Sequence, residues 1–141
     1  MTLRRYHAFT LLEVVVAVVI VALLAGATAP VLFRHVADAR VAAAKADLST
    51  LSLALEAFAL HVGDYPTSDE GLAALVSAPA DQAGWRGPYL RGTIPRDPWG
   101  REYLYTYQPG ESTYELVTRG RDGRAGGSGE DADLSAAEAR R

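Results

Sequence analysis

The N-terminal quarter of the sequence contains a long apolar segment, and this segment limits what the chain can fold into. Residues 14–33 are twenty consecutive uncharged residues, VVVAVVIVALLAGATAPVLF. As a helix with a rise of about 1.5 Å per residue, they would cover about 30 Å, the thickness of the hydrocarbon core of a bilayer. Residues 34–141 hold 12 of the 14 Lys and Arg residues and 16 of the 17 acidic residues. We therefore expect an apolar helix joined to one polar domain.

The composition excludes several classes of function. The chain has no cysteine, which rules out a disulfide framework, thiolate metal sites and cysteine nucleophiles. Its net charge of -3 does not favour a surface that follows nucleic-acid phosphates. The three histidines, at positions 7, 35 and 61, suggest no Ser/His/Asp arrangement. We therefore expect neither nucleic-acid binding nor enzymatic activity.

The charges before the apolar segment predict its orientation. Arg4 and Arg5 precede the segment and no acidic residue lies before Glu13, so the positive-inside rule places the N-terminus in the cytoplasm and the polar domain across the membrane. A secretory signal peptide cut after Ala27 or Ala29 is an alternative. The apolar segment exceeds the roughly 7–15 residues usual for a signal peptide, and an acidic residue at its start is unexpected there. A simple membrane anchor does not explain that acidic residue either.

Glu13 is the first candidate functional residue. A carboxylate in a membrane segment costs several kcal/mol unless it is neutralised or paired. No Lys or Arg lies between Glu13 and Arg34. A cut between Ala8 and Phe9 would create an α-amino group four residues before Glu13, and the two charges could then neutralise each other within one helix or between neighbouring helices.

The N-terminal residues, a short basic leader followed by FTLLEVVVAVVIVALLAGATAP, resemble the processing signal of the type IV pilin-like family, which includes the pseudopilins of type II secretion. The resemblance implies that a prepilin peptidase removes residues 1–8 by cutting between Ala8 and Phe9 and then methylates the new amine. It also implies that Glu13 sets the registry between subunits and that Pro30 loosens or kinks the helix. Ala8 stands where the family normally has glycine.

An amphipathic pattern continues beyond the apolar segment. Apolar residues step by three and four along the chain at Val41, Ala44, Leu48, Leu51, Leu55, Phe58 and Val62. The pattern predicts that the helix of residues 9–33 extends to about residue 62, where Gly63-Asp64 ends it. A coiled-coil dimer is the alternative, since three heptads are at the threshold for one. We favour packing of this stripe on the chain's own C-terminal domain.

The next segments predict a short helix and an ordered loop. Thr67 and Glu70 have the spacing of a capping box, which predicts a helix over residues 68–77. Residues 79–100 are rich in proline and glycine and read as a loop. This loop contains two tryptophans and a tyrosine, which favour packing over disorder because aromatic side chains bury large areas.

Residues 102–118 predict an antiparallel hairpin. Two alternating stretches flank the turn residues Gln108-Pro109-Gly110-Glu111, with Tyr103, Tyr105 and Tyr107 on one face of the first stretch. The expected fold class is therefore α+β, with a long N-terminal helix packed on a small antiparallel sheet.

The last informative segment, residues 119–134, combines glycines with acidic residues. Residues 120–134 read GRDGRAGGSGEDADL, with five glycines and four acids. Glycines allow the backbone to turn carbonyls inward, and carboxylates add hard oxygen ligands, a combination that suits Ca²⁺. The spacing of the acids does not fit an EF-hand. The segment also matches the calcium-binding nonapeptide repeat poorly and contains only one copy of it. On composition alone, a disordered acidic tail is the alternative.

The C-terminal motifs YPTSDEGLAAL, GPYL, PRDPWG and GGSGEDADL occur in an order that resembles the major-pseudopilin family of type II secretion. The resemblance implies a type IV pilin-like fold and one Ca²⁺ bound in the late loop. The implied ligands are the carboxylates and possible backbone carbonyls of these residues: Asp122, Asp131 and Asp133, with Arg119, Arg124 and Gly127.

The resemblance implies a structural role. The chain would wait as a single-pass protein of the inner membrane with residues 34–141 in the periplasm, and then polymerise into a pseudopilus that drives folded proteins through an outer-membrane secretin. Its expected partners are further copies of itself, minor pseudopilins, the prepilin peptidase, an inner-membrane assembly platform and, before assembly, lipid. A type IV pilin for adhesion, motility or DNA uptake is one alternative. An exported soluble domain that binds calcium or catalyses a reaction is the other.

Overall fold

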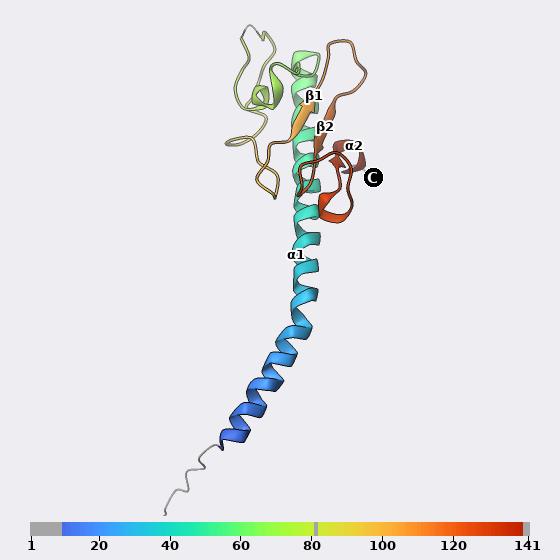
Figure 1. Cartoon of the computed structure of the whole chain (residues 1–141). Helices are drawn as coiled ribbons and strands as arrows, with labels where there is room; N and C mark the ends of the chain where they lie inside the picture. Colours follow the sequence, from blue (N-terminus) through green and yellow to red (C-terminus); the bar gives the residue numbers. More distant parts are fainter. Residues whose placement is uncertain (1–9, 81, 140–141) are drawn as a thin grey trace, which may run out of the picture. The chain divides into compact units, whose positions relative to one another are not determined.

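The structure is a computed structural model that describes residues 10–80 and 82–139, except for the side chains of residues 27–34 and 138–139. The elements in chain order are α1 (Leu11–Val62), the 3₁₀ helix η1 (Gly71–Leu75), β1 (Leu104–Thr106), β2 (Glu115–Thr118), the 3₁₀ helix η2 (Gly129–Asp131), β3 (Leu134–Ser135) and α2 (Ala136–Ala139) (Figure 1). The chain divides into two compact units, Met1–Val36 and Ala37–Arg141, which are described separately below. The expected α+β fold class is confirmed.

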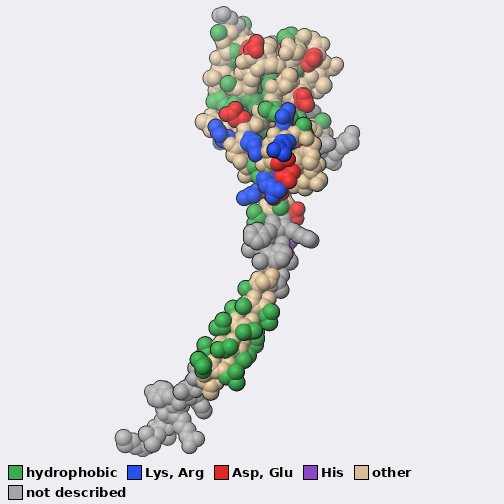
Figure 2. All heavy atoms as spheres, viewed as in Figure 1, with side chains coloured by type: hydrophobic (Ala, Val, Ile, Leu, Met, Phe, Trp, Pro, Cys, Tyr) green, Lys and Arg blue, Asp and Glu red, His purple; other side chains and the backbone are tan. Residues whose placement is uncertain are grey.

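The first unit contains the N-terminal part of α1, which begins at a threonine cap. The Thr10 hydroxyl oxygen accepts a hydrogen bond from the N–H of Glu13 at 3.2 Å, and the Thr10 carbonyl accepts one from Val14 at 3.2 Å. All the side chains of residues 11–26 are exposed, and Leu11 reaches 85 % exposure. Figure 2 shows hydrophobic side chains over this stretch. An exposed apolar surface of this extent requires a partner in solution.

Three sequence-based expectations concern residues outside the described part of the chain. The leader and the cleavage position between Ala8 and Phe9 lie there, and so does the side chain of Pro30. Among the side chains that are described, no helical stretch is both long enough and apolar enough to cross a membrane. The predicted apolar segment, residues 14–33, runs into the side chains that are not described.

The core of the second unit is the amphipathic stripe of α1. Ala44, Leu48, Leu51, Leu55 and Phe58 are completely buried. They pack with buried residues of η1 and β2 and with Tyr103, which directly precedes β1; these residues are Leu72, Ala74, Leu75, Tyr103 and Leu116. The stripe therefore serves the chain's own domain, as expected, and α1 ends where Gly63 takes a φ of +101°.

The helix predicted over residues 68–77 is wrong in type and length, because the chain forms only the 3₁₀ helix Gly71–Leu75. The capping box itself is present: the Thr67 N–H donates to the Glu70 carboxylate at 2.7 Å, and the Glu70 N–H donates to the Thr67 hydroxyl oxygen at 3.3 Å. Gly71 has a φ of +59°, a left-handed conformation that interrupts an α-helix immediately after this cap.

The sheet has the order β1-β2-β3, with antiparallel neighbours. In the β1–β2 hairpin Leu104 pairs with Val117, and in the second pair Thr118 lies opposite Leu134. The sequence analysis missed β3, and also α2, whose Ala136 is buried. A strand of two residues is too short to carry an alternating pattern.

The aromatic side chains of the second unit pack on its core. The Trp85 indole N–H donates to the carbonyl of Ala74 at 2.9 Å, and its ring meets Tyr89 edge-on with centroids 5.8 Å apart. The Tyr103 hydroxyl donates to Asp47 of α1 at 3.0 Å, and burial raises the pKa of Tyr103 well above its usual value. These contacts hold the loop of residues 79–100 against η1 and the start of the hairpin against α1.

Candidate functional site

The loop of residues 119–134 folds back on itself, and two glycines make this possible. The N–H of Arg121 donates to the carbonyl of Glu130 at 2.8 Å, which joins the two limbs of the loop. A Cβ atom on Gly120 would overlap the carbonyl oxygen of Glu130, and one on Gly127 would overlap that of Asp131. Both glycines have positive φ, +56° and +89°. Side chains at these two positions would separate the limbs.

Two of the three predicted acidic ligands accept backbone hydrogen bonds within the loop. The Asp122 carboxylate accepts from the N–H of Arg124 at 3.0 Å. The Asp133 carboxylate accepts from the N–H of Gly126 at 2.9 Å. Each carboxylate therefore helps to fix the course of the glycine-rich segment.

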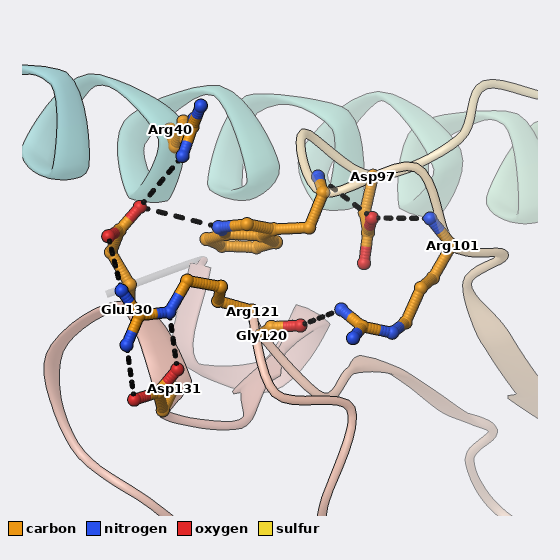
Figure 3. Close-up of polar contacts among 8 residues, drawn as sticks. Arg40, Asp97, Arg101, Gly120, Arg121, Glu130 and Asp131 are labelled. Carbon is orange, nitrogen blue, oxygen red and sulfur yellow. Dashed lines mark hydrogen bonds and ion pairs between the residues drawn. The ribbon is translucent and has the colours of Figure 1, made fainter.

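The third predicted ligand, Asp131, lies in an ion-pair network (Figure 3). The Arg121 guanidinium donates two hydrogen bonds of 2.9 Å to Asp131, one from Nε to Oδ1 and one from Nη2 to Oδ2. Its Nη1 also lies 3.5 Å from the carboxylate of Glu130, which Arg40 of α1 approaches at 3.6 Å. The Trp99 indole N–H donates to the same carboxylate at 3.4 Å. The hydrogen bonds from Arg121 to Asp131 are the largest cause of a raised pKa for that arginine.

The donor chemistry of the loop suits Ca²⁺, although the carboxylates do not converge on one point. The loop contains hard oxygen donors, namely its carboxylates and the backbone carbonyls of Arg119, Arg124 and Gly127. The Arg119 carbonyl accepts a hydrogen bond from the N–H of Gly123 at 3.1 Å. Within the described residues, which include all of 119–134, no three acidic or histidine side chains are grouped closely enough to hold an ion. Binding would require the side chains to rearrange, and Asp131 to leave Arg121.

A buried carboxylate outside the loop holds the start of it in place. Asp97 is 4 % exposed and accepts hydrogen bonds from the backbone N–H groups of Trp99 at 3.1 Å and Arg101 at 2.8 Å, and from the Thr118 hydroxyl at 2.5 Å. The Arg101 guanidinium in turn donates to the carbonyl of Gly120 at 2.7 Å. Asp97 and Arg101 therefore connect β2 and the first residue of the glycine-rich segment to the 97–101 turn.

Sequence reasoning missed Asp97, Arg101, Arg40 and Arg121. The sequence points to the acids, the glycines and a few backbone carbonyls of the late loop, and it indicates no role for the guanidinium groups of the arginines between them. Arg121 lies beside Asp122 in the sequence, yet it pairs with Asp131 ten residues later. The only available signal was the presence of arginines within an acidic loop.

The predicted assembly residue Glu13 is exposed in the first turn of α1. Its expected partner, the Phe9 amine, lies outside the described residues. The assembly contact therefore stays a prediction.

Comparison with known proteins matches nearly the whole chain. Residues 31–137 match the family described as type II secretion system protein G, and residues 3–29 match the prokaryotic N-terminal methylation motif. The chain is 38 % identical to type II secretion system core protein G of Vibrio cholerae over 135 residues, which cover 94 % of this chain and 92 % of that protein. It is 34 % identical to the protein of the same description from Pseudomonas aeruginosa over 134 residues, which cover 93 % of this chain and 94 % of that protein.

A solved structure has the same fold. The crystal structure of the major pseudopilin from the type 2 secretion system of enterohaemorrhagic Escherichia coli superposes with a TM-score of 0.56 at 30 % identity. The match covers 70 % of this chain and 86 % of that one.

Proposed function

The chain belongs to the type II secretion system protein G family, and we propose from this that it is the major subunit of a pseudopilus, a filament that drives folded proteins out of the cell. Its role is structural. Relatives with the same description share more than nine-tenths of its length, so the family assignment applies to both units of the chain.

The exposed apolar surface of α1 carries this proposal. The large hydrophobic side chains between Leu11 and Leu24 are 48 to 85 % exposed. Such a surface is stable only in lipid or against other apolar helices. A subunit that resides first in the inner membrane and then in a helical filament meets both conditions in turn. The match of residues 3–29 to the N-terminal methylation motif supports processing at the start of this helix.

The processing and assembly steps follow from the positions of two residues. A cut between Ala8 and Phe9 leaves a methylated Phe9 amine, and Glu13 of a neighbouring subunit then neutralises this charge inside the apolar core of the filament. The second unit faces the periplasm. The chain's partners are its own copies, minor pseudopilins, a prepilin peptidase and an inner-membrane assembly platform.

Deleting the chain from the cell that makes it tests this function. Folded proteins destined for export should accumulate in the periplasm, and the wild-type chain supplied from a plasmid should restore their release, because the filament cannot form without its major subunit. Secreted and periplasmic fractions are compared by immunoblot. Normal secretion together with a loss of surface adhesion or motility would instead identify a type IV pilin.

Calcium binding by the loop of residues 119–134 is a second part of the proposal. Asp122, Asp131 and Asp133 would supply carboxylate oxygens, and the carbonyls of Arg119, Arg124 and Gly127 are the candidates to complete the shell. Support comes from the donor chemistry and from the positive-φ glycines that turn the backbone. A bound ion would fix the loop and so the surface with which neighbouring domains pack.

Millimolar CaCl₂ should raise the melting temperature of the second unit in the full-length chain, because an ion that binds only the folded state stabilises it. Fluorescence of the two tryptophans in thermal scans, with the chain in detergent, measures the shift. Asp131→Ala should abolish it, whereas Asp69→Ala, which removes an exposed carboxylate outside the loop, should retain it. An identical wild-type melting curve in CaCl₂ and in chelator would overturn the calcium site.

A further inference from the structure

One basic residue, Arg121, donates hydrogen bonds to both oxygens of the Asp131 carboxylate. The Arg121–Asp131 pair has two hydrogen bonds of 2.9 Å in the parallel arrangement that makes arginine–carboxylate contacts strong and directional (Figure 3). Two carboxylates at this position, Glu130 and Asp131, are matched by two guanidinium groups, those of Arg121 and Arg40. The charges of the network are therefore balanced before any ion arrives.

A calcium ion at Asp131 would need the same oxygen atoms. Ca²⁺ binds carboxylate oxygens at about 2.3–2.6 Å, and an ion that coordinates both oxygens of Asp131 would displace the two hydrogen bonds from Arg121. The like charges of the ion and of Arg121 would also repel each other at that separation. Binding of the ion and binding of Arg121 at Asp131 therefore oppose each other.

We infer that Arg121 is a built-in cation that holds the loop of residues 119–134 closed without metal and competes with Ca²⁺ for Asp131. The inference rests on the calcium site proposed above. Arg121 sets the calcium concentration at which the loop exchanges its internal ion pair for the metal. It also gives the metal-free loop an order that an acidic, glycine-rich segment would otherwise lack, because it joins Glu130 and Asp131 to the opposite limb.

Arg91 provides a control, because it is an exposed arginine outside the loop of residues 119–134. Arg121→Ala and Arg91→Ala change the net charge equally, but only the first frees Asp131. A third variant, Arg121→Lys, keeps the positive charge and loses the bidentate hydrogen bonding to Asp131.

The experiment is a CaCl₂ titration of the full-length chain in detergent, by isothermal calorimetry at about 0.15 M salt, for the wild type and the three variants. Arg121→Ala is expected to bind Ca²⁺ about tenfold or more tightly than the wild type, with Arg121→Lys between the two. Arg91→Ala should change the affinity by less than about threefold, since exposed charges are screened at this ionic strength. In chelator, Arg121→Ala should also melt below Arg91→Ala.

The outcomes separate the two proposals. Equal affinities for Arg121→Ala and Arg91→Ala, or weaker binding by Arg121→Ala, would overturn the competition and leave the calcium site in place. Absence of binding in all four proteins would overturn both. Binding that is detectable only after Arg121 is replaced would support both, and would show that the arginine normally keeps the site closed.

Discussion

Replacing Glu13 with alanine is expected to abolish filament formation while the subunit still reaches the membrane. Glu13 lies in the first turn of α1, next to the exposed side chains of Leu12 and Val14. In lipid its carboxylate is a cost of several kcal/mol, so its removal should leave insertion unchanged or improve it. In the proposed filament the same carboxylate would neutralise the Phe9 amine of a neighbour, and the variant would leave that amine unpaired in an apolar core. Assembly should fall below detection.

The measurement is electron microscopy of sheared filaments, with membrane fractionation of the same cells. Glu115→Ala is the control, because it removes an exposed glutamate from β2 in the second unit. It should assemble normally. Filaments in wild-type amounts from Glu13→Ala would rule out the registry role, and loss of the variant from the membrane fraction would show that Glu13 acts before assembly.

The second large effect is expected in the core of the second unit, where two leucines on one helix provide a matched pair. Leu55 is completely buried and Leu53 is 65 % exposed. Leu55→Ala should lower the free energy of unfolding by about 2–5 kcal/mol, because it removes a buried side chain and leaves a cavity. Leu53→Ala should stay within about 0.5 kcal/mol of the wild type. The first change is a large fraction of the roughly 5–15 kcal/mol typical of a domain.

Urea unfolding of the full-length chain in detergent, followed by the fluorescence of Trp85 and Trp99, measures both variants. Equal midpoints for the two alanine variants would contradict the packing of the α1 stripe on its own domain. A strong effect of Leu53→Ala alone would instead favour a helix whose other face is the buried one.

The helix and its core were predictable because their signals are long and periodic. Seven apolar residues between Val41 and Val62 recur at helical spacing, and five of them are completely buried. The hairpin was predictable from alternation on both sides of a turn. In contrast, the stretch after Thr67 carries a correct capping box but forms only a 3₁₀ helix, because Gly71 takes a left-handed conformation that the local pattern does not reveal.

The candidate loop was predictable in composition but not in its pairing. Glycines and acids indicate a segment that turns sharply and carries negative charge. Which cation meets that charge depends on contacts between residues distant in sequence, such as Arg40 with Glu130 and Arg101 with Gly120. The same applies to Asp97, whose burial results from tertiary packing around Thr118 and not from its neighbours in the sequence.

Processing of this chain into a filament subunit is tested most directly by the N-terminus of the mature protein. Mass spectrometry of the chain purified from its own cell membranes should find N-methylated Phe9 as the first residue, as the proposed cut between Ala8 and Phe9 predicts. A mature chain that begins at Thr28 or Pro30 would contradict the account. It would show a secretory signal peptide and a domain released without the apolar helix on which assembly depends.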